Sequence, residues 1–197
     1  MALQPAQAEI LRKLIYSFGE IDEAAFVAFC ANWKEVTYGR KQLLTRQGET
    51  EKYLYLVLDG VQRAYCLHDN KEATLVFSYP ISFSGIIDSF FLQQPSRFYL
   101  ETITGSVLLR IHYNDMANLM AEYRQIETWV RLALTKTLAD TLQRQIELLA
   151  YSAEGKFTTM LQRSPHILNL IPHKYLASYI GVDPTNFSKL LGRVRLK

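Results

Sequence analysis

Residues 173–194 read HKYLASYIGVDPTNFSKLLGRV, and this stretch is the most informative part of the chain. It predicts a first short helix over 173–180 and a second that begins at Pro184 behind an Asp183 cap, because aspartate favours the N-cap and proline the first helical position. Gly181 stands between them, where a tight turn needs a positive φ. Two short helices joined by a glycine-containing turn form a helix-turn-helix.

The spacing of side chains within this segment supports the motif. Ala177 is small at the point where the helices would cross closely, and apolar residues stand where the helices must face each other: Leu176, Ile180, Val182, Phe187 and Leu190. The opposite face of the second helix carries hydrogen-bonding side chains that suit base edges in the major groove. We therefore predict a DNA-binding surface, and the alternative is an ordinary helical hairpin with a polar face. The predicted DNA-binding residues are Thr185, Asn186, Ser188, Lys189, Arg193, Arg195 and His173.

Residues 34–112 have a different character, because short runs rich in Val, Ile, Thr, Tyr and Phe alternate there with turn signals. The run YLYLVL at 53–58 is followed by Asp59-Gly60, which predicts a tight hairpin and a return strand over 61–67. Many short strands at this spacing indicate an antiparallel sandwich or roll, which can enclose a small-molecule cavity or be packed solid. The further predicted strands are 73–77, 98–103 and 107–111.

Helices are expected on both sides of the strand region. Apolar residues recur at helical spacing over 5–33, with a break at Gly19 and a candidate N-cap at Asp22. After the strands, Asn114 is the expected N-cap of a short helix, and a longer helix is expected over 126–151.

The long helix over 126–151 carries apolar side chains at three- and four-residue steps over roughly six turns or more. Such a stripe can pack on the chain's own sheet, or it can form a seam with a second copy of the chain. The stripe is wide enough to serve both, and we predict a homodimer. The predicted seam residues are Trp129, Leu132, Ala139, Leu142 and Ile146.

Composition excludes several classes of protein. Apolar residues make up 49% and charged residues 21% of the 197 residues, which argues for a globular chain. The net charge of +3 is too small to indicate a nucleic-acid partner by itself, although the last ten residues are basic and hold no acid. The N-terminus does not read as a signal peptide, and no apolar run reaches the roughly 18 residues of a membrane span, so a cytoplasmic protein is expected.

Catalytic and metal-binding motifs are not found. The sequence has no GxSxG, HExxH, P-loop or dinucleotide fingerprint, and its four histidines are scattered, so an enzyme is not expected. Cys30 and Cys66 lie far apart and belong to no CxxC or Cys/His cluster, so neither a metal nor a cofactor is expected. Free thiols in a reducing compartment are the expected state of both cysteines.

The succession of a β-roll, a long helix and a terminal helix-turn-helix resembles the Crp/Fnr family of transcription regulators. The residues that carry the resemblance are YLYLVLDG at 53–60 and IGVDPTNFSK at 180–189, and the resemblance covers nearly the whole chain. It implies an α+β fold with a cyclic-nucleotide-binding-like, jelly-roll-like domain, a dimerising helix and a DNA-binding winged helix. The corresponding expected domains are residues 1–125, 126–151 and 152–197.

The resemblance also implies a function. A member of this family would be a sequence-specific, dimeric regulator that binds double-stranded DNA, with Thr185, Asn186 and Lys189 on the base-reading side of its second helix. The alternative is a regulatory or interaction module that has lost DNA binding.

One part of the chain departs from the family pattern. Cyclic-nucleotide binders of this family carry a Gly-Glu pair before a short helix and an Arg-Ser or Arg-Thr pair after it; the glutamate holds the ribose and the arginine the cyclic phosphate. Here Gly85 is followed by Ile86, and Arg97 by Phe98. Ile86 cannot bind a ribose hydroxyl, and Arg97 is either a ligand anchor or an ordinary surface arginine. We take these four residues as the candidate effector site and expect an effector other than cyclic AMP.

Overall fold

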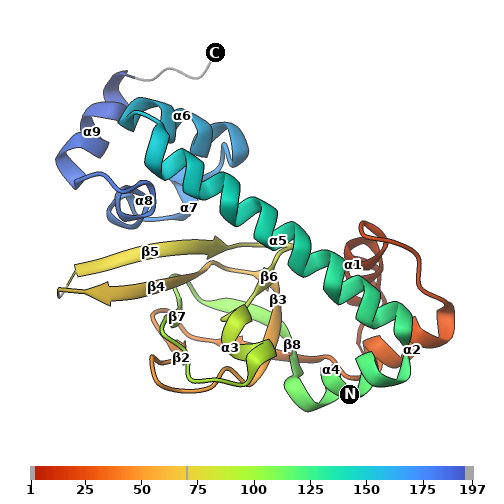
Figure 1. Ribbon diagram of the computed structural model, residues 1–197. Helices are drawn as coiled ribbons and strands as arrows, with labels where there is room; N and C mark the ends of the chain where they lie inside the picture. The colour runs from red at the N-terminus through yellow and green to blue at the C-terminus, as the bar shows by residue number, and fades with distance from the viewer. Residues whose placement is uncertain (1–2, 70, 194–197) are drawn as a thin grey trace.

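The computed structural model describes residues 3–69 and 71–193, and its architecture is α+β, as the sequence predicts. Figure 1 shows a β-roll, a long helix that runs across it, and a group of short helices at the C-terminal end. The strands are β1 (Lys34–Tyr38), β2 (Leu43–Thr45), β3 (Tyr53–Asp59), β4 (Gln62–His68), β5 (Lys71–Ser78), β6 (Phe83–Ser84), β7 (Tyr99–Thr102) and β8 (Ser106–His112). The helices are α1 (Pro5–Tyr16), α2 (Glu23–Ala31), α3 (Ile87–Leu92), α4 (Tyr113–Glu122), α5 (Arg124–Ala150), α6 (Ala153–Arg163), α7 (Ile167–Leu170), α8 (His173–Ile180) and α9 (Pro184–Arg193).

Two antiparallel four-stranded sheets form the roll, with the strand orders β1-β8-β3-β6 and β2-β7-β4-β5. In the first sheet Leu56 of β3 pairs with Leu109 of β8, and in the second Ala64 of β4 pairs with Leu100 of β7. Alternate residues of these strands point inward, so that both sheets contribute side chains to one apolar core. The buried residues of this core are Tyr55, Val57, Ala64, Ile86, Leu100 and Leu108.

The prediction of a hairpin at Asp59-Gly60 is wrong. Strands β3 and β4 belong to different sheets, and the turn leads the chain from one sheet to the other. The tight turn itself is present: Gly60 has a φ of +88°, and a Cβ there would lie 2.4 Å from the carbonyl oxygen of Gly105. A turn signal does not determine which strands pair, because each strand pairs in the register that buries its apolar face. The hairpin of this region joins β4 to β5, with His68 opposite Lys71.

The N-cap residue predicted from the sequence is confirmed for α2 and is wrong for α4. Asp22 caps α2 by accepting the Ala25 N–H at 2.8 Å. The cap of α4 is His112 rather than Asn114: the His112 Nδ1 accepts the Asn114 N–H at 3.1 Å. Strand β8 ends at His112 and α4 begins at the next residue, so the cap falls on the last residue of the strand.

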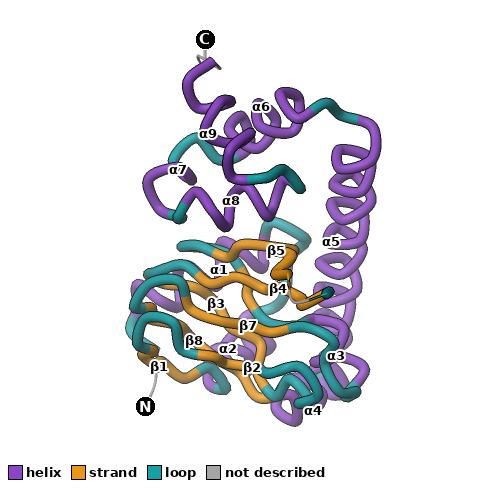
Figure 2. The backbone as a smooth tube through the Cα atoms, turned by 90° about the vertical axis from the view of Figure 1, so that its left-hand side faces the viewer, coloured by secondary structure: helices purple, strands orange, loops and turns teal. Residues whose placement is uncertain are grey.

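The long helix α5 begins and ends within two residues of its predicted bounds. Its first turns pack on the roll and on α1 and α2 through buried Ile126, Trp129 and Val130. Figure 2 shows α5 along one side of the molecule, with α6 to α9 above the edge of the roll at β5. The core of these C-terminal helices includes Val61, Phe77 and Ile103 from the roll, so the apolar packing is continuous between the two parts.

Candidate functional site

Helices α8 and α9 form the helix-turn-helix that the sequence predicts. Gly181 between them has a φ of +67°, and the Val182 N–H returns to the Ala177 carbonyl at 3.0 Å. Asp183 caps α9, where its Oδ1 accepts the Asn186 N–H at 2.9 Å. The two helices face each other through fully buried Leu176, Ala177, Ile180 and Phe187. This core fixes the direction in which α9 presents its other side.

The outer side of α9 is polar and exposed. Thr185, Asn186, Ser188, Lys189 and Arg193 are all exposed on it. The side-chain amide of Asn186 donates to the Asp183 carboxylate, and the Ser188 hydroxyl donates to the Pro184 carbonyl at 3.0 Å. Thr185 and Lys189 make no side-chain hydrogen bond within residues 3–69 and 71–193, so both are available to a partner.

The two remaining predicted DNA-binding residues are His173 and Arg195. His173 is exposed at the start of α8, with its ring 5.6 Å from that of Phe187. It therefore adjoins the helix-turn-helix core without belonging to the outer side of α9. Arg195 lies outside the described residues.

The first helix of the motif, α8, is attached to the edge of the roll at β5. The Thr74 N–H donates to the Ser178 hydroxyl at 2.9 Å, and that hydroxyl donates to the Glu72 carbonyl at 3.0 Å. The rings of Phe77 and Tyr179 lie 5.2 Å apart beside these bonds. Ser178 therefore satisfies an edge strand that would otherwise leave its backbone groups open.

Arg63 of β4 is the largest charged side chain buried in the described residues, with 2% of its surface exposed. Its guanidinium donates to Glu72 and Glu101 at 2.6 Å each. Its two faces are covered by the rings of Tyr65 and, from α8, Tyr175. Sequence analysis missed this cluster; an arginine in the middle of a strand was the only signal for it.

A second charged cluster joins the end of α5 to the C-terminal helices. The buried Glu147 carboxylate accepts from Arg144 at 3.2 Å and from Arg163 of α6. Arg144 also covers the Tyr179 ring at 4.0 Å and donates to the Tyr179 carbonyl. Both clusters therefore hold α8 between the roll and α5.

The candidate effector residues of the roll are not arranged around a phosphate. Ile86 is buried in the core of the roll, whereas the Arg97 side chain is 78% exposed and lies 3.6 Å from Asp88. Gly85 has a φ of +140° and approaches the Tyr53 carbonyl, and Phe98 is half-buried against the core. Arg97 is therefore paired with an aspartate at the surface, and Ile86 contributes its apolar side chain to the core of the roll.

A buried glutamate lies beside this segment, and sequence analysis missed it. The Glu51 carboxylate accepts the Thr45 hydroxyl at 2.6 Å and the backbone N–H groups of Tyr53 and Ile86 at 3.3 Å each. Burial raises the pKa of Glu51, and these hydrogen bonds oppose the increase only in part. The backbone N–H of Ile86 is therefore already engaged by the protein's own carboxylate.

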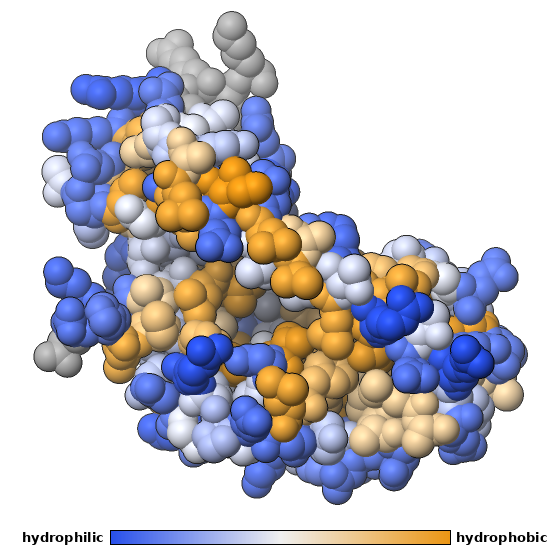
Figure 3. Space-filling view, in the orientation of Figure 1, coloured by the Kyte–Doolittle hydropathy of each residue, from blue (hydrophilic) through white to orange (hydrophobic). Residues whose placement is uncertain are grey.

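The predicted seam residues of α5 divide into two groups. Trp129 is buried in the protomer's own core, 5.6 Å from both the Phe29 and the Phe83 rings, and Leu132 is half-buried. Ala139, Leu142 and Ile146 are exposed, the latter two by 52% each. The same half of the helix also exposes Leu138 and Leu149. Figure 3 shows apolar surface gathered along α5 and in the hollow beside it.

Residues 3–69 and 71–193 contain neither a metal-ligand cluster nor a helix that could span a membrane. In this part of the chain no three His, Cys, Asp or Glu side chains are grouped so that they could hold a metal ion. None of its helices combines the length and the hydropathy needed to cross a bilayer. Cys30 and Cys66 are unpaired and half-buried.

The comparisons with known proteins agree with this architecture. Residues 35–123 match the family model of the cyclic nucleotide-binding domain. FixK2 from Bradyrhizobium japonicum has a similar structure, with a TM-score of 0.72, 15% identity and coverage of 82% of this chain and 83% of that one. A search of curated protein sequences finds no match.

Two further solved structures share the fold over most of both chains. The c-di-GMP-responsive global regulator CLP of Xanthomonas campestris has a TM-score of 0.67 and 19% identity, covering 87% of this chain and 91% of that one. A protein of Eubacterium rectale assigned to the Crp/Fnr family has a TM-score of 0.69 and 16% identity, covering 90% and 88%. Residues 35–123, which match the cyclic nucleotide-binding domain model, are followed by a long helix and a helix-turn-helix, and this chain therefore has the fold seen in regulators of the Crp/Fnr family.

Proposed function

We propose that this protein is a sequence-specific DNA-binding transcription regulator of the Crp/Fnr type that acts in the bacterial cytoplasm. The observation that carries the proposal is the outer side of α9, where Thr185, Asn186, Ser188 and Lys189 are all exposed while Phe187 on the opposite side is buried. A helix of this kind reads base edges with its exposed polar side chains in the major groove. Arg193, Arg195 and His173 would contact phosphates around it.

The proposed regulator is a homodimer joined along the second half of α5. Its apolar residues Leu138, Leu142, Ile146 and Leu149 recur at steps of four, four and three residues, which is the spacing of a two-chain seam. Leu132 and Ala139 would lie beside this seam, whereas Trp129 would support the helix from the protomer's own core. A two-fold dimer calls for a palindromic operator with half-sites about one helical turn, roughly 34 Å, apart.

We further propose the domain division expected from the sequence: a sensory domain over 1–125, a dimerisation helix over 126–151 and a DNA-binding domain over 152–197. The sensory domain would respond to a small effector other than cyclic AMP. The exposed Arg97 and the buried Ile86 support this, because neither can play the part that a cyclic nucleotide requires. No catalytic role is proposed.

Selection from a random duplex library with the purified full-length chain tests the proposed function and returns the operator. Fluorescence anisotropy then compares the selected duplex with a scrambled one at two salt concentrations, since phosphate contacts weaken with salt whereas base readout discriminates the sequences. The expected result is salt-dependent binding to both duplexes with clear preference for the selected one. Failure to bind any duplex at low salt would favour a module that has lost DNA binding.

A further inference from the structure

A cavity of about 390 Å³ lies between the loop that joins α1 to α2 and the first turns of α5. This volume is near the lower end of the roughly 300–1,000 Å³ typical of small-molecule sites. Phe18 and Ile21 from the loop and Leu132 from α5 give the cavity apolar walls. It is separate from the core of the roll and from the helix-turn-helix.

The walls of this cavity are held together by a reciprocal pair of hydrogen bonds. The Gln125 amide donates to Asp22 Oδ2 at 3.0 Å, and the Asp22 N–H donates to Gln125 Oε1 at 2.7 Å. Asp22 also caps α2 with its other carboxylate oxygen. The loop is therefore fixed on α5 before any ligand arrives, which lowers the entropic loss on binding.

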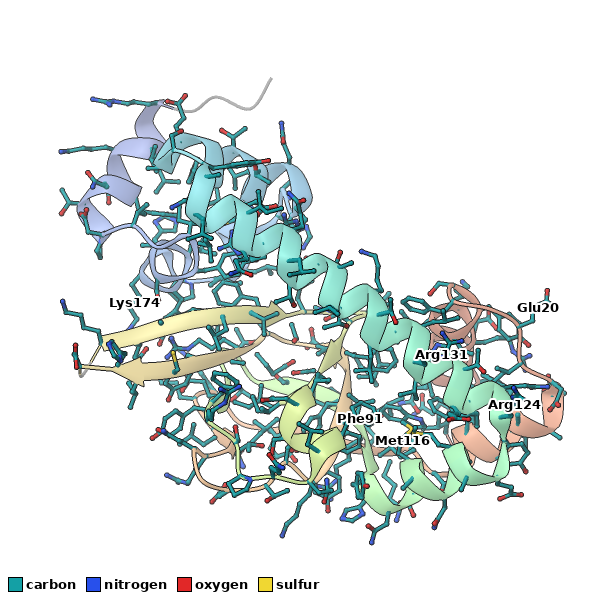
Figure 4. The ribbon with its side chains drawn as sticks, in the orientation of Figure 1. Glu20, Phe91, Met116, Arg124, Arg131 and Lys174 are labelled. Atoms are coloured by element: carbon teal, nitrogen blue, oxygen red, sulfur yellow. The ribbon has the colours of Figure 1, made fainter. Side chains whose placement is uncertain are left out.

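Two opposite charges line the cavity without neutralising each other. Glu20 stands on the loop and Arg124 at the start of α5, and both are exposed (Figure 4). Neither forms an ion pair with any residue in the described ranges. The positive end of the α5 dipole adds to the charge of Arg124.

Trp129 also lines the cavity, and its ring carries a polar atom without a partner. Trp129 is more than nine-tenths buried, and its indole Nε1 makes no hydrogen bond within residues 3–69 and 71–193. A buried N–H without an acceptor destabilises the folded state. The Nε1 atom is itself enclosed by the protein, so Trp129 offers the cavity the apolar part of its ring.

We propose that this cavity binds an α-amino acid with an apolar side chain. The carboxylate of the amino acid pairs with Arg124, and its ammonium group pairs with Glu20. The apolar side chain packs among Phe18, Ile21 and Leu132. A simple carboxylate would meet the uncompensated charge of Glu20, and a simple amine that of Arg124, so the pair of charges selects a zwitterion. This site does not depend on the proposed DNA binding.

Isothermal titration calorimetry of the full chain with leucine and phenylalanine tests the proposal. Leucine and phenylalanine are expected to bind, whereas 4-methylpentanoate, which lacks the ammonium, and leucinamide, which lacks the carboxylate, should each bind at least about tenfold more weakly. The variants Arg124→Gln and Glu20→Gln should each weaken leucine binding by a similar factor. Arg131→Gln is the matched control, because Arg131 is an exposed cation of α5 that does not line the cavity (Figure 4).

Thermal unfolding without ligand checks that each variant folds, and Glu20 and Arg124 are exposed, so their substitutions leave the core intact. Equal affinity for leucine and 4-methylpentanoate would overturn the assignment to a zwitterion. The site itself is wrong if neither leucine nor phenylalanine binds at millimolar concentration. It is also wrong if Arg124→Gln and Glu20→Gln both bind leucine with unchanged affinity.

Discussion

The guanidinium carbon of Arg63, in the roll, lies 3.9 Å from the centre of the Tyr175 ring, in the first helix of the helix-turn-helix. The Tyr65 ring covers the other face of the guanidinium at 4.1 Å. Burial lowers the pKa of Arg63, but the hydrogen bonds to Glu72 and Glu101 raise it by more. The pKa of Arg63 is therefore raised overall. A charged group of the roll is thus covered by a residue of the helix-turn-helix, and this contact joins the two parts of the chain.

Tyr175→Ala is expected to loosen the attachment of α8 to the roll. Removal of the ring deletes a cation–π contact with a largely desolvated cation, which contributes about 1–2 kcal/mol. Hydrogen exchange measures the effect: the Thr74 amide, which donates to Ser178, should exchange faster in Tyr175→Ala. Tyr175→Phe retains the ring and should behave as the wild type. Equal exchange of Thr74 in all three proteins would show that Tyr175 does not hold the helix.

Leu142→Asp is expected to shift the protein from dimer to monomer. A carboxylate in an apolar seam, where it has no partner, destabilises the association by several kcal/mol. Analytical ultracentrifugation at a series of concentrations measures the change, and Gln143→Asp, one residue away on the exposed helix, is the control. A wild-type chain that is already monomeric at high micromolar concentration contradicts the proposed dimer.

Cyclic AMP is expected to bind weakly or not at all. Ile86 offers no carboxylate to the ribose, and the Arg97 side chain is turned to solvent beside Asp88. Calorimetry with a cyclic-nucleotide-binding relative as the positive control measures this directly. A dissociation constant in the low micromolar range would mean that other residues of the roll hold the ribose and the phosphate.

Lys189→Ala and Arg193→Ala are expected to affect DNA binding in different ways. If Lys189 contacts a guanine, Lys189→Ala should weaken the free energy of binding to the selected operator by about 1–3 kcal/mol. It should also relax specificity at one position per half-site. Arg193→Ala, like Arg195→Ala, should weaken the selected and scrambled duplexes alike and reduce the dependence on salt. Fluorescence anisotropy at two salt concentrations separates the two patterns. Unchanged affinity of Lys189→Ala for both duplexes would rule out the assigned side of α9.

Glu51 is expected to make stability depend on pH. Because its pKa is raised in the folded state, the folded protein binds this proton more tightly than the unfolded chain does. Its contribution to the free energy of unfolding is therefore fully present below the ordinary value of about 4.5 and is lost as the pH rises through the folded-state pKa. Urea unfolding at a series of pH values should show this decline in the wild type and a flatter profile in Glu51→Gln. Glu9→Gln, at an exposed site, should leave the profile unchanged, and a profile identical in all three proteins contradicts the role of Glu51.

The sequence by itself determined the parts of the fold that depend on neighbouring residues. Gly181 permits the left-handed turn and Asp183 caps α9, and both effects operate over three or four positions. The bounds of α5 follow from the same kind of local periodicity. The exposed residues of α9 could be predicted from the sequence. Side chains repeat on a helix every three to four residues, so the positions of the apolar side also identify the polar side.

Only the tertiary structure decided which strands pair and which buried charges meet. The turn at Gly60 is local, but its strands join different sheets because pairing depends on what lies opposite each face. Arg63 meets Glu101 across a separation of 38 residues, and Thr74 meets Ser178 across 104. No local pattern encodes such contacts. They form only when segments far apart in the sequence pack together, because the polar groups buried by that packing must then be hydrogen-bonded.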